Sequence, residues 1–316
     1  MGKMIKALSK SQKIKNIEKR EIYLKKMRLQ KKQKFLEKIV VTAYVEQVDK
    51  KQDFVAFGKT DEFCYGVSAD GHGGSSTINF FRSLDWESTL SHKNFVESIC
   101  EGIKNLGNTS NDGSTLTVFK IYPTHIDVYW AGDSSARIYK NGINIFETDD
   151  HDLNNKEEMA IIEKNEIPHR HTWRLCVKNP STVTQLPARY FKFGGNSDPN
   201  SINMTRSFGH NGYTGCYMSH ARIPIEKSAD STITDTYKVI TGSDGFWDMI
   251  CPEDDSLLVN TEVNAKDLAM FAVERWGKTD WLYVRDELPM FPAMYKEGIS
   301  LGKGDDVSVA VAQFSL

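Results

Sequence analysis

Short runs rich in β-branched and aromatic residues, joined by tight turns, set the strongest limit on the fold of this chain. They lie between Val40 and Phe314 and read VVTAYVEQV, DFVAFG, EFCYGVSAD, STLTVFKIY, HIDVYWAGD, ARIYKNGINIFET, TYKVITGSD and DVSVAVAQF. Asn141-Gly142 is a strong signal for a type I′ hairpin turn, and Pro123-Thr124 separates a second pair of strands. Because hairpins join antiparallel strands, the pattern favours antiparallel sheet over a Rossmann-like parallel one.

Helical periodicity appears at three places among these strands. Apolar residues recur at helical spacing after Gly74, within Lys156–Lys164 and within Asp267–Trp276. The chain has 316 residues, 40% of them hydrophobic, which is enough to bury a large core. We therefore predict that residues 39–316 form one compact domain of the α+β class, in which helices cover sheets built mostly of hairpins.

The first 38 residues form a basic segment with a composition of their own. They contain 14 Lys and Arg against 3 Glu, a net charge of +11, whereas residues 39–316 carry a net charge of −13. Good helix formers dominate, which predicts a helical arm from about Ser9 to Ile39. Such an arm can be a solvated or partly docked helix, or it can contact a polyanion such as nucleic acid or an acidic membrane surface, or a protein partner such as a nuclear import receptor.

The cellular setting is predicted from what the sequence lacks. No window is apolar enough for a membrane-spanning helix, and the basic start has no apolar stretch of the kind found in secretory signals. The 5 cysteines form an odd set without a CxxC pair or zinc-like spacing. Reduced thiols in the cytoplasm or nucleus fit this pattern, and a monomer is the default expectation.

Carboxylates next to glycine mark the ends of three apolar strands. Asp70 follows YGVSA, Asp244 follows VITGS, and the pair Asp305-Asp306 precedes VSVAVAQF. If these ends meet, two unit charges ~4 Å apart would repel by about 4 kcal/mol at an effective dielectric constant near 20, so the cluster would need a cation. Carboxylate and backbone oxygens are hard ligands, which favours Mg²⁺ or Mn²⁺ over Zn²⁺.

These acidic motifs belong to a longer ordered series. It consists of YGVSADGHGG at 65–74, DGSTLTVFKI at 112–121, VYWAGDSSARIYKNG at 128–142, TDDHDLNN at 148–155, INMTRSFG at 202–209, VITGSDGFWDMICPED at 239–254 and GKGDDVSVAVAQF at 302–314. In order and flanking residues, the series resembles the metal-dependent serine/threonine protein phosphatases of type 2C, the PPM family. The resemblance covers most of residues 39–316. It implies an α/β/β/α sandwich, in which helices flank two antiparallel sheets, and a phosphohydrolase with two Mg²⁺ or Mn²⁺ ions.

The resemblance assigns direct metal ligands to four positions. Asp70 resembles the carboxylate that bridges both ions, and Gly71 resembles the neighbour that offers its backbone carbonyl. Asp244 and Asp305 resemble the other direct ligands, while Asp306 stands where the family usually has Asn.

Three further positions take family roles. Asp133 resembles a residue that can hold a weaker third ion, and Asp53 matches the second acid of an early Glu-Asp pair that supports the ions through water. His72 resembles the histidine proposed as general acid toward the leaving alkoxide, a role that suits an imidazole. The implied activity is hydrolysis of phosphoserine and phosphothreonine in a phosphoprotein substrate by attack of a metal-bridged hydroxide.

The sequence departs from the family near the substrate. The family has an Arg before the Glu-Asp pair that grips the phosphate, whereas here Lys50 or Lys51 supplies the positive charge without the planar fork of arginine. Gln52 replaces the usual Glu, and His210 replaces the Asp that follows the TRxxG block. These changes keep open a catalytically weak or inactive relative that acts as a binding module.

Two other segments and one other enzyme class were considered. Residues 167–200 occupy the place of a variable flap, in which His169 and His171 are expected on an exposed polar face, and residues 281–300 are expected to form a loop-rich insertion. Cys216 and Arg222 match the Cys-x5-Arg spacing of cysteine phosphatases, but the intervening Tyr, Met and His do not suit a phosphate cradle, so coincidence is the preferred interpretation.

Overall fold

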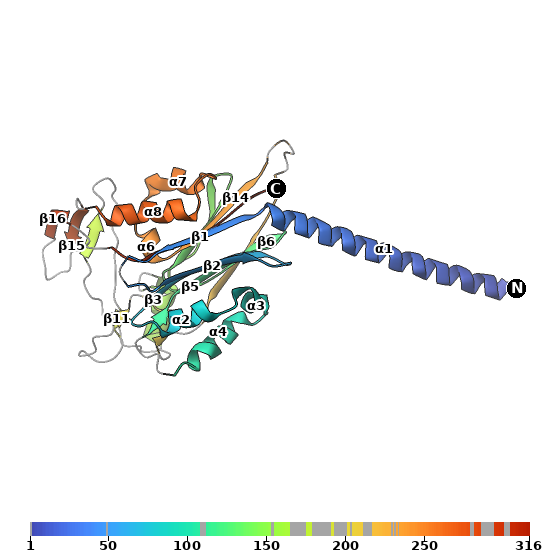
Figure 1. Ribbon diagram of the computed structural model, residues 1–316, viewed down its shortest axis with the longest axis horizontal. Helices are drawn as coiled ribbons and strands as arrows, with labels where there is room; N and C mark the ends of the chain where they lie inside the picture. The colour runs from blue at the N-terminus through green and yellow to red at the C-terminus, as the bar shows by residue number, and fades with distance from the viewer. Residues whose placement is uncertain are drawn as a thin grey trace.

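The fold is known from a computed structural model of the whole chain (Figure 1). The structure describes residues 2–48, 50–107, 112–152, 155–164, 175–178, 191–192, 201–202, 204–210, 217–228, 230, 232, 234–278, 281–285, 294–299 and 304–316. The predicted flap histidines His169 and His171 and the thiol of Cys216 lie outside the described residues.

Two antiparallel sheets pack face to face at the centre of the molecule. The first sheet has the order β1 (Val40–Glu46), β17 (Val307–Ser315), β14 (Thr236–Gly242), β7 (Ser135–Lys140) and β8 (Ile143–Glu147). The second has the order β12 (Phe208–Gly209), β4 (Gly113–Ser114), β3 (Cys64–His72), β5 (Leu116–Ile121), β6 (His125–Ala131) and β13 (Ser219–Pro224), with β2 (Asp53–Lys59) also paired to β3. A buried apolar cluster between the sheets, which includes Phe119, Val128, Ile138 and Val239, holds them together.

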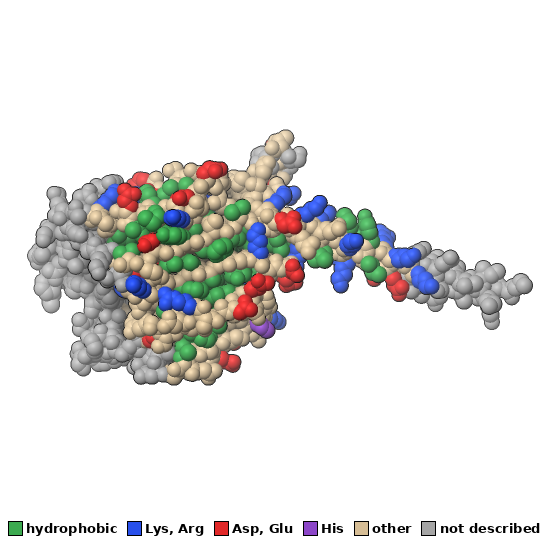
Figure 2. All heavy atoms as spheres, in the orientation of Figure 1, with side chains coloured by type: hydrophobic (Ala, Val, Ile, Leu, Met, Phe, Trp, Pro, Cys, Tyr) green, Lys and Arg blue, Asp and Glu red, His purple; other side chains and the backbone are tan. Residues whose placement is uncertain are grey.

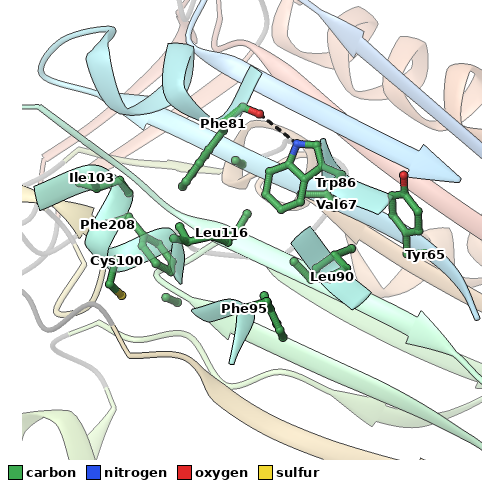
Figure 3. Packing of buried hydrophobic residues seen from close by; sticks show 14 of the residues in the cluster. Tyr65, Val67, Phe81, Trp86, Leu90, Phe95, Cys100, Ile103, Leu116 and Phe208 are labelled. Atoms are coloured by element: carbon green, nitrogen blue, oxygen red, sulfur yellow. Dashed lines mark hydrogen bonds between the residues drawn. The ribbon is translucent and has the colours of Figure 1, made fainter. Parts of the chain in front are cut away.

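Helices cover the outer faces of both sheets, as Figure 1 shows. One group consists of α2 (Ser76–Ser83), α3 (Trp86–Ser91) and α4 (Phe95–Lys104), and the other of α6 (Asp244–Trp247), α7 (Asp255–Val259) and α8 (Ala265–Trp276), with a 3₁₀ turn at Pro252–Asp254 and a separate α5 (Lys156–Lys164). Figure 3 shows how the first group packs: Phe81, Trp86, Leu90 and Phe95 belong to one buried cluster with the strand residues Val67 and Leu116. The indole Nε1 of Trp86 donates a 3.0 Å hydrogen bond to the carbonyl of Phe81.

The predicted architecture is confirmed, with omissions. The strands expected from the β-rich runs and the helices expected at 156–164 and 267–276 are present. The Asn141-Gly142 turn has positive φ at both residues, 52° and 78°, as a type I′ hairpin requires. The sequence analysis missed α3, α4 and β13, and each of these elements has 10 or fewer residues.

A small third sheet corrects the expectation for residues 281–300. It has the order β16 (Met294–Ile299), β15 (Trp281–Arg285) and β9 (Leu175–Lys178). The segment expected to be mostly loop therefore contains two strands, and it pairs with a strand from the predicted flap. A further two-stranded pair joins β10 (Phe191–Lys192) to β11 (Ser201–Ile202).

The N-terminal helix α1 (Gly2–Lys38) extends away from the sandwich (Figure 1). Among its described side chains, Leu36 in the last turn is buried in the core, as is the following Ile39. Lys and Arg side chains are spaced along the described part of the helix (Figure 2). The division into a 1–38 arm and a 39–316 domain stays a prediction. None of the described helices is long and apolar enough to cross a membrane.

Candidate metal centre

Four chain segments that carry the predicted ligands meet at one end of the sandwich. Asp53 opens β2 and lies directly opposite Asp70 on β3. Asp244 begins α6 just after β14, and a Cβ on its neighbour Gly245 would lie only 2.1 Å from the carbonyl oxygen of Asp306, so these two segments are in contact. The sheets thus bring together acidic residues that are far apart in the sequence, such as Asp53 and Asp306.

The other carboxylates raise the pKa of Asp70. The pKa of Asp70 lies well above its ordinary value, first because the group is buried and then because of the charges of Asp244, Asp53, Asp305 and Asp133. The cluster predicted from three strand ends therefore exists as an electrostatic unit. Like charges of this kind are costly in a folded protein unless a cation compensates them.

Asp53 is the most deeply buried member of the cluster, with 1% of its surface exposed. Burial raises its pKa to about 7, and the charge of Asp244 adds to the effect, while polar groups of Ser243, Asp70 and Ser308 lower it. Neither carboxylate oxygen nevertheless forms a hydrogen bond of good geometry with a described residue. Buried polar atoms normally have partners, so these two oxygens are suited to a cation or a water molecule that a cation holds.

Asp133 lies in the turn between β6 and β7, after Gly132, whose φ of 102° favours glycine. Its pKa is raised well above the ordinary value by burial, then by the charges of Asp244 and Asp150. The Oδ1 atom of Asp133 forms no hydrogen bond with a described residue. Asp150, which the sequence analysis did not single out, has its pKa raised to about 7, mainly by burial.

The loop after Asp70 is shaped for close approach of backbone. The amide of Gly71 donates a 3.0 Å hydrogen bond to the carbonyl of Gln52, and a Cβ on Gly71 would lie 2.8 Å from that oxygen. Gly73 has a φ of 75°. Asp112 accepts hydrogen bonds from the amides of Ser76 and Thr77 at the start of α2, which fixes the helix that follows the loop.

The donor set fits a hard divalent cation. Carboxylates and a nearby glycine backbone are the oxygen ligands that Mg²⁺ and Mn²⁺ prefer. Asp53 and Asp133 have buried oxygens that form no hydrogen bond within the described part of the chain. Among the residues that the structure describes, no three His, Cys, Asp or Glu side chains already form a complete metal-holding group. The described carboxylates therefore lie near one another, but no three of them are close enough to a common point to hold one ion together.

Lys50 is the cation that the chain itself brings to this cluster. Its Nζ lies 3.0 Å from Oδ1 of Asp305 and donates to Oδ2 at 3.1 Å. Lys51, the other predicted phosphate-binding lysine, is exposed, has a φ of 58°, and makes no ion pair with a described carboxylate. Of the two lysines, only Lys50 is placed at the acidic cluster.

Gln52, where the family has Glu, ties three segments of the site together. Its backbone N–H donates to Oδ2 of Asp306 at 2.9 Å, and its side-chain Nε2 donates to the carbonyl of Gly74 at 2.5 Å. A glutamate carboxylate could not donate this second bond at neutral pH. Arg82 of α2 donates to the carbonyls of Lys51 and Asp53 and so holds the same loop from the other side.

His72 contacts His210, the residue that replaces the family's Asp. Their Nε2 atoms lie 2.5 Å apart and the rings stack with centroids 4.6 Å apart. Burial lowers the pKa of His72 to about 3, and the positive charge that His210 would carry adds to the effect. These surroundings favour the neutral ring, whereas an acidic neighbour would favour the protonated one.

The contacts of these partners were not predicted from the sequence. Gln52 and His210 were recognised there as departures from the family and Asp112 as the start of a family block, whereas Arg82 belongs to no motif. Each of the four acts on residues at least 22 positions away. The second residue of the Cys-x5-Arg match, Arg222, is bound elsewhere: its Nε and Nη2 atoms donate to the two carboxylate oxygens of Asp127 at 2.7 and 2.8 Å. This pairing supports the view that the match is a coincidence.

Comparison with known proteins adds independent information. Residues 30–278 match the family model of Protein phosphatase 2C. The chain belongs to this family. The match includes Asp53, Asp70, Asp133 and Asp244, whereas Asp305 lies beyond it.

Individual relatives of this protein phosphatase 2C member are distant. The chain is 26% identical over 230 residues to a probable protein phosphatase 2C 7 of Oryza sativa subsp. japonica, and this alignment covers 67% of the chain and 54% of the relative. A second rice relative, probable protein phosphatase 2C 52, is 26% identical over 208 residues, which cover 61% of the chain and 37% of the relative. The chain thus spans about half the length of these relatives, or less.

Solved structures with the same fold show still lower identity. A C. elegans sex determining protein has a TM-score of 0.56 at 17% identity, over 87% of this chain and 64% of that one. A serine/threonine phosphatase of S. agalactiae has a TM-score of 0.51 at 17% identity, over 87% of this chain and 98% of that one. At this identity, the likeness establishes the sandwich fold.

Proposed function

We propose that the protein is a protein serine/threonine phosphatase that depends on Mg²⁺ or Mn²⁺. The observation that carries the proposal is the convergence of Asp70, Asp244 and Asp305, with Asp53 and Asp133 beside them, in a chain that belongs to the protein phosphatase 2C family. Substrates would be proteins that carry phosphoserine or phosphothreonine.

The residues of the cluster would hold the ions. Asp70, Asp244, Asp305 and the carbonyl of Gly71 would be direct ligands for two ions, and Asp133 would help to hold a third. When bound, such ions activate a water molecule and neutralise the charge of phosphate oxygens. Asp53 would act through water, since its buried carboxylate lies beside Asp70 and forms no hydrogen bond of good geometry with a residue that the structure describes.

The remaining roles belong to groups around the cluster. Lys50 carries a positive charge at the edge of the site and would attract the phosphate of the substrate. His72, in the same loop as Asp70, would give a proton to the leaving alkoxide, a role that requires the protonated ring, which burial and the contact with His210 disfavour. Gln52 and Arg82 would keep the loop of residues 50–53 in place through their bonds to backbone carbonyls.

The test is hydrolysis of a phosphothreonine peptide by the purified protein with Mn²⁺, with Mg²⁺ and with EDTA, beside the variant Asp244→Asn. We expect turnover that requires metal and is lost in the variant. Asp244→Asn removes a negatively charged ligand, so the ions would bind more weakly and would no longer be held in the position that the reaction needs. Turnover that survives EDTA and the Asp244→Asn change would refute the metal mechanism.

A catalytically weak or inactive relative is the alternative proposal. It is favoured by the presence of Gln52 and His210 where the family has acids, and of Lys50 where it has Arg. Tight Mn²⁺ binding by a folded protein that hydrolyses neither aryl phosphate nor phosphopeptide would select this alternative. In that case the fold would act as a binding module for a partner protein.

We also propose that α1 is a polyanion-contacting arm. Its described basic side chains are Lys15, Lys19, Arg20, Lys25, Lys26, Arg28, Lys31, Lys32, Lys34 and Lys38. Within the described part of the chain, the ion pair of these residues with the domain is Lys32 to Glu62 at 3.5 Å. The other described basic groups are therefore available to an external anion. We also propose a cytoplasmic or nuclear location for the protein.

A further inference from the structure

Lys50 makes a contact that matters for the metal itself. Its ammonium group spans both oxygens of Asp305, at 3.0 and 3.1 Å. Partial burial lowers the pKa of Lys50, but the charges of Asp305, Asp70 and Asp244 together outweigh this effect and raise it. The ammonium group therefore lies in the field of three of the carboxylates expected to hold the ions.

The hydrogen bonds of Asp305 leave little room for a second cation. Oδ1 also accepts a 2.9 Å hydrogen bond from the amide of Asp306, so this oxygen serves two donors. A divalent ion binds a carboxylate oxygen at about 2.0–2.2 Å, which would bring it close to an ammonium group that shares the same oxygen. Two cations at such a separation repel strongly, so Lys50 and a divalent ion compete for Asp305.

The backbone around Lys50 is anchored, so the contact is part of the fold rather than a chance position of a surface lysine. The next residue, Lys51, has a φ of 58°, and its carbonyl accepts a 2.9 Å hydrogen bond from Arg82. Gln52 then donates to Asp306. The Lys50 side chain is nevertheless 49% exposed, so its ammonium group can leave Asp305 for solvent without unfolding of the loop.

We propose that Lys50 is an internal cation that competes with divalent metal for Asp305. It neutralises the carboxylate in the metal-free protein and leaves it when an ion binds there. The lysine thereby weakens metal affinity, stabilises the metal-free protein, and is released at the edge of the site when metal binds. This inference rests on the proposed metal centre.

The test is Mn²⁺ binding to metal-stripped protein, measured by titration calorimetry and by electron paramagnetic resonance of the free ion. Lys50→Met removes the charge but keeps the length of the side chain, and we expect its dissociation constant for Mn²⁺ to fall about tenfold. Lys50→Arg keeps the charge and should bind no more tightly than the unmodified protein. Lys51→Met, the matched control, removes a charge next to Lys50 and should change the constant by less than about twofold.

Thermal unfolding gives a second readout that a merely structural lysine would not produce. Lys50→Met should melt at a lower temperature without metal, yet gain more in melting temperature at saturating Mn²⁺ than the unmodified protein gains. Equal or weaker Mn²⁺ binding by Lys50→Met, with unmodified protein that does bind Mn²⁺, would overturn the inference and leave the proposed function intact. Absence of Mn²⁺ binding in both folded proteins would overturn the metal centre and the inference together.

Discussion

Asp53 and Asp70 lie directly opposite each other on the antiparallel strands β2 and β3, and both carboxylates are buried. Like charges at opposed positions of a sheet destabilise the pair. Two acidic groups in these positions cost the folded protein stability. Such a cost is expected at a site that binds a cation, because the cation compensates it. This relationship leads to a prediction about the metal-free protein.

Replacement of Asp53 by Asn should stabilise the metal-free protein by about 1 kcal/mol or more, because it removes a buried carboxyl group whose ionisation is opposed by burial and by nearby acidic groups. The same change should reduce the stabilisation that Mn²⁺ provides. Urea unfolding in EDTA and in Mn²⁺ measures both effects. Asp61→Asn, on the exposed turn of the same hairpin, serves as the control, and a loss of metal-free stability in Asp53→Asn would contradict the prediction.

His72→Asn should affect substrates according to their leaving groups. A proton donor matters most when the leaving group is a poor one such as the alkoxide of threonine, and least for p-nitrophenolate. We therefore expect kcat/KM for a phosphothreonine peptide to fall about 10²-fold or more, and that for p-nitrophenyl phosphate much less.

Asp244→Asn is the contrasting variant, since loss of a metal ligand should lower both rates together. If His72→Asn also lowers both rates by the same factor, His72 acts through structure or binding and not as a proton donor. The contact with His210 makes this comparison necessary, because that neighbour disfavours the protonated form of His72.

The sequence was sufficient for features that depend on local signals. The Asn141-Gly142 turn was predictable because few residues adopt positive φ at two successive positions. Asp70, Asp244 and Asp305 were recognisable because carboxylates beside glycine at the ends of apolar strands are unsuited to a core. The resemblance then assigned their roles.

Other features depend on how distant segments meet. The Lys50 to Asp305 contact joins residues 255 positions apart, and the side-chain bond from Gln52 to Gly74 depends on a loop conformation that no motif encodes. Helix α3 has only six residues, and the residues of strand β13 alternate only between intermediate and exposed positions, so both give weak signals. Helix α4 has 10 residues, more than the predicted α2 and α5, so its length does not explain why it was missed. In these cases tertiary packing, rather than local propensity, selects the structure.

Acidification should destabilise the fold through His151, a residue with 2% of its surface exposed. Its Nδ1 accepts a hydrogen bond from the amide of Gly132, and its Nε2 bonds to Ser219, so the ring must be neutral with the proton on Nε2. Burial, followed by the charge of Arg206, lowers the pKa of His151 to about 4. Protonation of Nδ1 would place its N–H against the N–H of Gly132. The hydrogen bond from Gly132, which precedes Asp133, would then be lost.

The sign follows from linkage. Because the folded pKa lies below the ordinary value of 6.5, His151 binds fewer protons in the folded than in the unfolded chain between pH 6.5 and about 4, and its contribution to stability falls as the pH falls through this range. One such group contributes a slope of at most about 1.4 kcal/mol per pH unit. His151→Asn keeps an acceptor near Gly132 but does not titrate, so between pH 6.5 and about 4 its free energy of unfolding in urea should rise relative to that of the unmodified protein, whereas exposed His92→Asn should match the unmodified protein.

Segregation of charge should make the protein bind polyanions although its net charge is −2. Helix α1 has 37 residues and so spans about 55 Å, a length over which many anionic groups can be contacted at once. Removal of residues 1–29 leaves the buried Leu36 and Ile39 in place, so the domain should stay folded. We expect the full chain to be retained on a heparin column in a salt-dependent manner and the truncated chain to pass through.

A charge-matched pair of variants distinguishes the contribution of the arm to heparin binding from that of the net charge of the protein. One variant changes four basic residues of the helix to Gln: Lys25, Lys26, Arg28 and Lys31. The other changes four exposed lysines of the domain to Gln: Lys93, Lys104, Lys164 and Lys227. Because both lose the same charge, only the helix variant should elute at lower salt, and equal shifts for the two would show that the arm is not a distinct binding surface.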